Sequence, residues 1–94
     1  MHRLLSTWRP SLAGSSPEIV RRSLIDALSA LDAASDALRS IEVHPRDYLD
    51  RMPALRVEQA RRREMIETVD GYAREIEDAV ITIEDHIAEQ ESTR

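Results

Sequence analysis

The apolar residues of this chain recur at helical spacing in two long segments. In the first segment, apolar positions follow one another three or four residues apart from Val20 to Ile41, which is typical of a helix with one buried stripe. Pro17 suits the first turn of a helix, and Ser15 with Glu18 matches a capping box. The pattern therefore predicts a helix over residues 17–41.

A second apolar stripe begins near residue 52 and continues almost to the end of the sequence. Asp50 is a good N-cap residue, Pro53 is tolerated in a first turn, and no later proline interrupts the pattern. We predict a second helix over residues 51–89, about 60 Å long at ~1.5 Å per residue. Its stripe consists of Met52, Leu55, Gln59, Arg62, Ile66, Val69, Ala73, Ile76, Val80, Ile83 and Ile87.

The segment between the stripes contains Pro45 and is expected to connect the two helices. A connection of about ten residues makes consecutive helices antiparallel neighbours, so the predicted fold is an all-α helical hairpin. A fold-back within this segment places residue 17 opposite residue 76. The same register brings Arg21 and Arg22 near Asp70 and Glu75, and Tyr48 and Leu49 are expected to cover the end of the core.

In this register the last part of the second stripe has no partner on the first helix. Each buried Ile or Val side chain stabilises a fold by about 1.5–3 kcal/mol, and soluble monomers avoid a patch of several such residues. Either the N-terminal arm covers the patch with Leu4, Leu5 and Trp8, or a second copy does. We expect a homodimer, in which two hairpins form a four-helix bundle or coiled coil. The expected dimer or arm interface is Ile76, Val80, Ile83 and Ile87.

The chain is expected to hold one domain. Residues 1–16 are predicted to be a flexible arm, residues 17–91 the helical hairpin, and residues 92–94 a disordered tail. The apolar stretch at the N-terminus is too short for a signal peptide, and no run reaches the roughly 18–20 residues of a membrane span. We therefore expect a cytoplasmic protein with no membrane partner. The absence of cysteine excludes disulfides and thiolate metal sites.

Charge divides the chain into two unlike parts. Residues 1–63 contain 11 arginines and 8 acidic residues, whereas residues 64–94 contain 2 arginines and 10 acidic residues. The net charge of −5 does not attract a phosphate backbone, so direct binding to nucleic acid is not expected. The acidic end suits a basic protein partner. Candidate partner-binding residues are Glu75, Glu77, Asp78, Glu84, Asp85, Glu89, Arg61, Arg62 and Arg63.

Three residues of the second helix depart from its pattern. Gln59 and Arg62 are polar at stripe positions, where they either fix the register through hydrogen bonds or form a slot for a partner. Gly71 lies in the middle of the helix at a cost of about 1 kcal/mol relative to Ala. We interpret it as a close crossing between helices.

One pattern of acidic residues raises the possibility of a metal-dependent enzyme. The pairs Glu64–Glu67 and Glu75–Asp78 have the spacing with which all-helical nucleotide pyrophosphohydrolases bind Mg²⁺. In those enzymes the pairs face each other from two helices, whereas here both belong to one predicted helix. We therefore predict no catalytic residues, no metal site and no cofactor.

The sequence favours a non-enzymatic protein-binding module, an adaptor or assembly protein built as a helical bundle with an acidic end. An alternative is a small phage or mobile-element inhibitor, of the anti-CRISPR or anti-defence type, that blocks a host nucleic-acid-binding complex. A second alternative is an Mg²⁺-dependent nucleotide hydrolase that uses Glu64, Glu67, Glu75 and Asp78.

Overall fold

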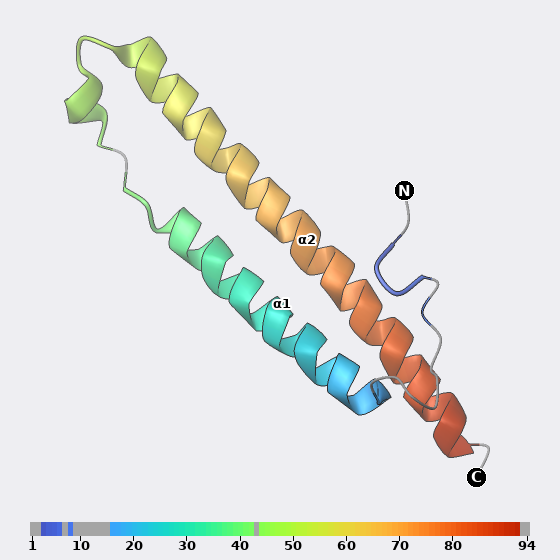
Figure 1. Ribbon diagram of the computed structural model, residues 1–94. Helices are drawn as coiled ribbons and strands as arrows, with labels where there is room; N and C mark the ends of the chain where they lie inside the picture. The colour runs from blue at the N-terminus through green and yellow to red at the C-terminus, as the bar shows by residue number, and fades with distance from the viewer. Residues whose placement is uncertain (1–2, 7, 9–15, 43, 93–94) are drawn as a thin grey trace.

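The computed structural model describes residues 3–6, 8, 16–42 and 44–92. These residues form helix α1 (Pro17–Arg39), the 3₁₀ helix η1 (Pro45–Tyr48) and helix α2 (Met52–Ser92). Helices α1 and α2 pack against each other in an antiparallel hairpin (Figure 1), which confirms the predicted fold class. The hairpin is a rod of 69 × 24 × 22 Å.

Helix α1 begins where the sequence predicts, with Pro17 in its first turn. The N-cap is Ser16, whose Oγ accepts a hydrogen bond from the backbone N–H of Ile19 at 3.3 Å. Ser15, the predicted cap, lies outside the described residues. The helix ends two residues earlier than predicted, at Arg39.

Helix α2 runs 41 residues without a break. The carbonyl of Arg51 accepts the first hydrogen bonds of the helix from Ala54 and Leu55, so Arg51, and not Asp50, precedes its first turn. The helix continues through Ser92. Ser92 therefore does not belong to a disordered tail, and residues 93–94 lie outside the described residues.

The register predicted for the hairpin is wrong. Ser35 contacts Asp70, and Arg21 pairs with Glu84, so α1 lies about three turns closer to the C-terminus of α2 than expected. The cause is the connection, which does not turn back at once. It runs beside the first turns of α2 and packs η1 against that helix (Figure 1).

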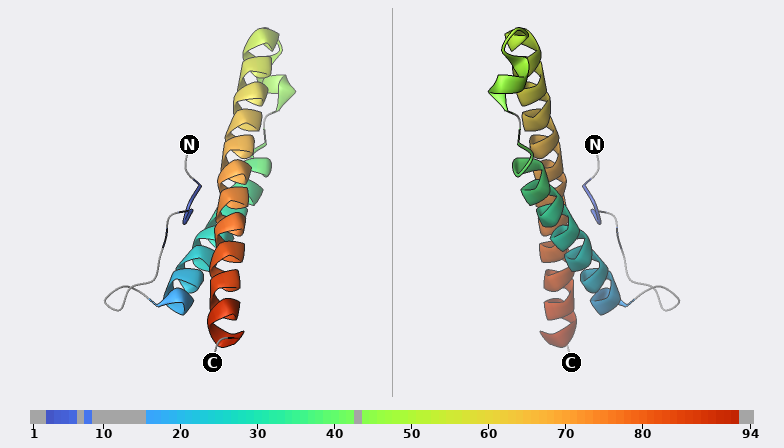
Figure 2. Two further views of the ribbon diagram at one scale, coloured as in Figure 1. Left: turned by 90° about the vertical axis from the view of Figure 1, so that its right-hand side faces the viewer. Right: turned by 90° about the vertical axis from the view of Figure 1, so that its left-hand side faces the viewer.

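The main core lies where the N-terminal arm meets the hairpin. Leu24, Ala79 and Ile83 form a buried cluster, and Ile83 is fully inaccessible to solvent. Packed against this cluster are Val20 of α1, Ile76 and Val80 of α2, and Leu5 and Trp8 of the arm. Figure 2 shows the described part of the arm against one broad side of the hairpin.

The predicted uncovered patch is thus covered within the chain. Because of the register, Val20 and Leu24 of α1 reach the patch, and the arm adds Leu5 and Trp8. Ile76, Val80 and Ile87 are half-buried. The residues of this patch do need a cover, as the sequence predicts. Helix α1 and the arm supply that cover, so the patch gives no reason to expect a second copy there.

The opposite end of the hairpin has a smaller core. Leu55 is buried, but Leu49 is 75% exposed, so the prediction that Leu49 covers the end of the core is wrong. Tyr48 instead lies beneath the guanidinium of Arg51, whose Cζ is 5.7 Å from the ring centroid. This end therefore depends more on polar contacts.

Candidate interaction surfaces

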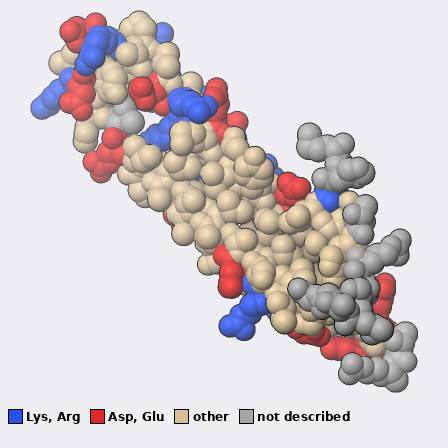
Figure 3. Space-filling model, viewed as in Figure 1, with Lys and Arg blue, Asp and Glu red and all other residues tan. Residues whose placement is uncertain are grey.

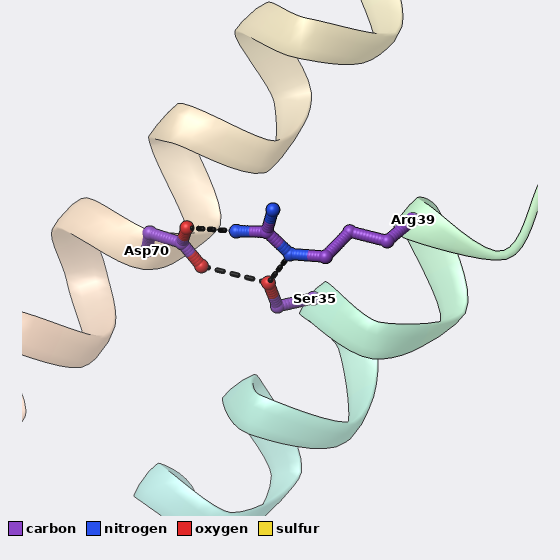
Figure 4. A network of polar contacts seen from close by, with 3 residues as sticks. All are labelled: Ser35, Arg39 and Asp70. Carbon is purple, nitrogen blue, oxygen red and sulfur yellow. Dashed lines mark hydrogen bonds and ion pairs between the residues drawn. The ribbon is translucent and has the colours of Figure 1, made fainter.

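A network of three side chains joins the C-terminal end of α1 to the middle of α2 (Figure 4). The Ser35 hydroxyl donates to Asp70 Oδ1 at 2.7 Å, and Arg39 Nη2 donates to Asp70 Oδ2 at 2.7 Å. Arg39 Nε also donates to Ser35 Oγ at 3.3 Å, which closes the network. Ser35 is buried, so its hydroxyl needs this partner. We call Ser35, Arg39 and Asp70 the polar clamp.

The sequence did not predict the clamp. Its members carry ordinary polar side chains, and the expected register placed Asp70 near Arg21 and Arg22 instead. The sequence alone does not distinguish a buried Ser from an exposed one, because Ser occurs often on exposed helix faces. The clamp is a structural device that fixes α1 against α2.

A groove of about 520 Å³ adjoins the clamp. It contains both polar stripe positions of α2, and Arg62 donates to the backbone carbonyl of Ile41. Arg62 therefore binds the segment after α1 to α2, which favours the interpretation that it fixes the register. The groove is lined by Arg39, Gln59, Arg62, Arg63, Ile66, Glu67 and Asp70.

The three consecutive arginines do not form one basic surface. Arg61 pairs with Glu64 on the same helix at 3.3 Å, Arg62 turns toward the loop, and Arg63 lines the groove. The structure therefore brings only Arg62 and Arg63 of this predicted set to one site.

The acidic candidates are also divided among several roles. Glu75 accepts a hydrogen bond from the backbone N–H of Leu4 at 3.3 Å, and Glu84 pairs with Arg21 at 3.3 Å. The side chains of Glu77, Asp78, Asp85 and Glu89 are exposed. Two of the six acidic candidates are thus engaged within the chain.

The residues of the hydrolase hypothesis are not brought together. The pairs Glu64–Glu67 and Glu75–Asp78 both lie on α2, and Glu67 is about 12 Å from Glu75 along the helix axis. Within residues 3–6, 8, 16–42 and 44–92, no group of three His, Asp or Glu side chains is placed to hold a metal ion. The two pairs therefore do not face each other from different helices.

His86 lies beneath the arm. The ring of Trp8 meets the ring of His86 edge-on, with centroids 5.3 Å apart and an interplanar angle of 88°. His86 Nε2 is buried and has no hydrogen-bond partner among the residues that the structure describes. His86 is thus a contact of the arm and is separate from the acidic residues beside it in the sequence.

The interpretation of Gly71 as a close crossing between helices is wrong. A Cβ atom at this position would lie 4.0 Å from Nη2 of Arg74, which is ordinary van der Waals contact with a flexible side chain. No other helix approaches Gly71 closely among the described residues.

The broad side of the hairpin that carries the arm continues toward the loop as an uncharged surface. On α2 it extends the arm-covered stripe toward the N-terminus, and on α1 it follows positions three or four residues apart. Figure 3 views the molecule from this side, with charged side chains gathered at the ends and edges. We call this surface the open face; it consists of Ala27, Ala30, Ala34, Leu38, Ile41, Met65, Val69 and Tyr72.

The open face exposes large apolar side chains. Tyr72 is 58% exposed, Ile41 48% and Met65 42%. Ile41 ends the apolar stripe predicted for the first helix, whereas Tyr72 and Met65 lie beside the predicted stripe of α2 and not on it. A second apolar stripe on one helix, offset from the first, is the signal that identifies them.

Comparison with protein families, with curated proteins and with solved structures found no match to this chain. In the described part of the chain, neither helix contains an apolar stretch that would cross a membrane.

Proposed function

We propose that this chain is a non-enzymatic protein-binding module and that the open face is its binding surface. The observation that carries the proposal is a continuous uncharged surface over both helices, on which Ile41, Met65 and Tyr72 are exposed. Apolar patches bordered by charged residues mark sites of protein–protein interaction. Tyr and Met are also enriched in interfaces relative to the rest of the surface.

The shape of the molecule supports this proposal. The radius of gyration is 19.6 Å, whereas a compact domain of this length has about 12 Å. Among the described residues, the buried apolar side chains are Leu24, Leu55, Ala73, Ala79 and Ile83. A thin rod with so small a core offers most of its side chains to a partner.

The open face is a better candidate than the acidic end. Glu75 and Glu84 are already engaged within the chain, and the remaining acidic side chains are spread around α2. A charged helix surface of this kind is usually solvated, whereas an exposed patch of Ile, Met and Tyr is costly to leave in water.

The proposal can be tested by photo-crosslinking in the cell that makes the protein. A crosslinking amino acid at Ala30 or Tyr72 reports on the open face, and one at Asp32 reports on the charged edge of the same hairpin. We expect defined protein adducts from Ala30 and Tyr72 and none from Asp32. No adduct from the open face, or equal adducts from all three positions, would refute the proposal.

The same experiment distinguishes the inhibitor hypothesis. A crosslinker at Asp85 reports on the acidic end of α2, where an inhibitor would contact a basic partner. Adducts from Asp85 without adducts from Ala30 or Tyr72 would replace the open face with the acidic end.

A further inference from the structure

We propose that the groove beside the polar clamp binds the carboxylate group of a ligand, through Arg63 together with Arg39 and Arg62. The proposed function concerns the open face, which is a different surface. Arg63 and Glu67 lie two residues before and two residues after Met65, so each is about 160° around the axis of α2 from Met65. The inference therefore does not depend on the open face, and either can fail without the other.

The groove gathers cations from both helices. Arg39 is the last residue of α1, whereas Arg62 and Arg63 are consecutive residues of α2, and all three line the same groove. Its volume of about 520 Å³ lies within the roughly 300–1,000 Å³ of pockets that hold small organic ligands. Ile66 adds a half-buried apolar side chain to the wall. The hairpin thus provides cations and an apolar contact around a space that an organic group can occupy.

Two of the three guanidinium groups are held in place by the chain. Arg39 Nε donates to Ser35 Oγ at 3.3 Å and Arg39 Nη2 donates to Asp70 Oδ2 at 2.7 Å, whereas Arg62 donates to the backbone carbonyl of Ile41. Each guanidinium has five N–H donors, so both keep donors for a ligand. In Figure 4 the third nitrogen of Arg39, Nη1, has no partner among the residues drawn. Side chains restrained in this way lose less conformational entropy on binding.

The groove also contains polar side chains that have no partner within the described chain. Arg63 forms no hydrogen bond or ion pair with another described residue, and the same holds for Gln59. Gln59 is one of the two polar residues in the apolar stripe of α2, where the sequence allowed either a register contact or a slot for a partner. Arg62 makes the register contact and Gln59 does not, which favours the slot at this position.

The charges around the groove favour one carboxylate over a phosphate. Arg39 and Asp70 neutralise each other in the clamp, so the remaining charges are Arg62, Arg63 and Glu67, with a net charge of +1. A phosphate group carries about −1.5 to −2 at pH 7, which exceeds this charge and is repelled by Glu67. A guanidinium binds a carboxylate through two parallel N–H···O hydrogen bonds. The groove therefore suits an organic acid with a single negative charge.

The first test is an NMR titration of the full chain with sodium benzoate, which joins one carboxylate to an apolar ring. We expect saturable shifts of the Nε–Hε signals of Arg62 and Arg63. Benzamide has the same shape without the charge and should produce no such shifts. Inorganic phosphate should bind more weakly than benzoate.

Two substitutions should change the affinity in opposite directions. Arg63→Gln removes the unpaired guanidinium and should raise the Kd for benzoate at least about tenfold. Glu67→Gln removes a carboxylate one turn from Arg63 that competes with the ligand, and should lower the Kd. Arg56→Gln is the matched control, because it removes the same charge from α2 about 10 Å along the helix and outside the groove. Its Kd should stay within about twofold of the natural chain, since salt screens charges at that distance.

A second ligand distinguishes the source of the carboxylate. It is a tripeptide with blocked ends and a central glutamate, and the same peptide with glutamine is its control. If the glutamate peptide binds more tightly than benzoate, the ligand is an acidic side chain of a partner protein. If benzoate binds more tightly, the ligand is a small organic acid.

Three outcomes would overturn this inference. One is the absence of saturable shifts with either carboxylate, or shifts that Arg63→Gln leaves unchanged. Another is an equal loss of affinity in Arg63→Gln and Arg56→Gln, which would show a response to net charge alone. The third is tighter binding of phosphate than of benzoate, which excludes a carboxylate as the ligand. Crosslinking through Ala30 and Tyr72 is expected in every case, so these outcomes leave the proposed function unchanged.

Discussion

The two ends of helix α1 are held against α2 by different forces. At the arm end, three segments surround Leu24, Ala79 and Ile83, and Leu5 and Trp8 of the arm supply the third layer. At the C-terminal end of α1 only two helices meet, and the polar clamp joins them beside the middle of α2. The comparison shows two ways to stabilise a pair of helices, which on their own bury only a narrow stripe.

The apolar cluster around Ile83 and the polar clamp also differ in how strongly they fix the alignment of the two helices. Apolar burial is non-directional, so the cluster around Ile83 stabilises the arm end without selecting one alignment of the helices. The polar clamp needs donors and acceptors at defined distances, so it is satisfied in one register. We infer that the arm end supplies most of the stability and the clamp supplies the alignment.

The largest effect is expected at the centre of the arm end. Ile83→Ala removes a fully buried side chain and should lower the free energy of unfolding by about 2–4 kcal/mol. The control is Ile81→Ala, which changes the same residue type two positions earlier, where the side chain is 57% exposed. Its loss should be below about 1 kcal/mol, measured by urea denaturation and circular dichroism. Equal losses would show that Ile83 is not buried.

A smaller effect is expected at the clamp. Asp70→Asn removes the charge that accepts from Ser35 and Arg39, and should cost about 1–2 kcal/mol. Combining it with Ser35→Ala should cost less than the two single changes together, with a coupling of about 0.5–1.5 kcal/mol. Asp78→Asn, on the exposed side of α2, is the control and should change stability by less than about 0.5 kcal/mol. Strict additivity would mean that the clamp does not exist in solution.

The arm itself is tested by Trp8, the single tryptophan of the chain. Because Trp8 packs against the core, its fluorescence should change at the same urea concentration as the helical signal. Trp8→Ala should lower the free energy of unfolding by about 1 kcal/mol, since the ring is only half-buried. A fluorescence change that precedes the loss of helix would show that the arm is not part of the core.

The smallest expected effect is at Gly71, beside the clamp, and has the opposite sign. Gly71→Ala should raise the free energy of unfolding by about 0.5–1 kcal/mol, because Ala favours the helix and the added Cβ meets only the flexible side chain of Arg74, at 4.0 Å. Thermal unfolding of the purified chain measures this gain. A loss of stability would mean that another segment or another molecule approaches α2 at Gly71.

Much of the local structure follows from the residues themselves. The three- and four-residue spacing predicts both helices, and Pro17 marks the start of α1 within the correct turn. The stripe of α2 includes Leu55, Ala73 and Ile83, which are buried. Ala79 was not predicted, because it packs on the side of α2 that the arm covers, outside the stripe that faces α1.

The alignment of the helices could not be read from the same pattern. A heptad stripe looks alike after a shift of one or two repeats, so periodicity permits several registers of similar apolar burial. The register depends on the path of residues 40–51, which have no periodic pattern, and on the Ser35–Asp70 and Arg62–Ile41 contacts between distant parts of the chain. Secondary structure here follows from local spacing, whereas the covered and open surfaces follow from long-range contacts, because only these distinguish between registers that the helices tolerate equally.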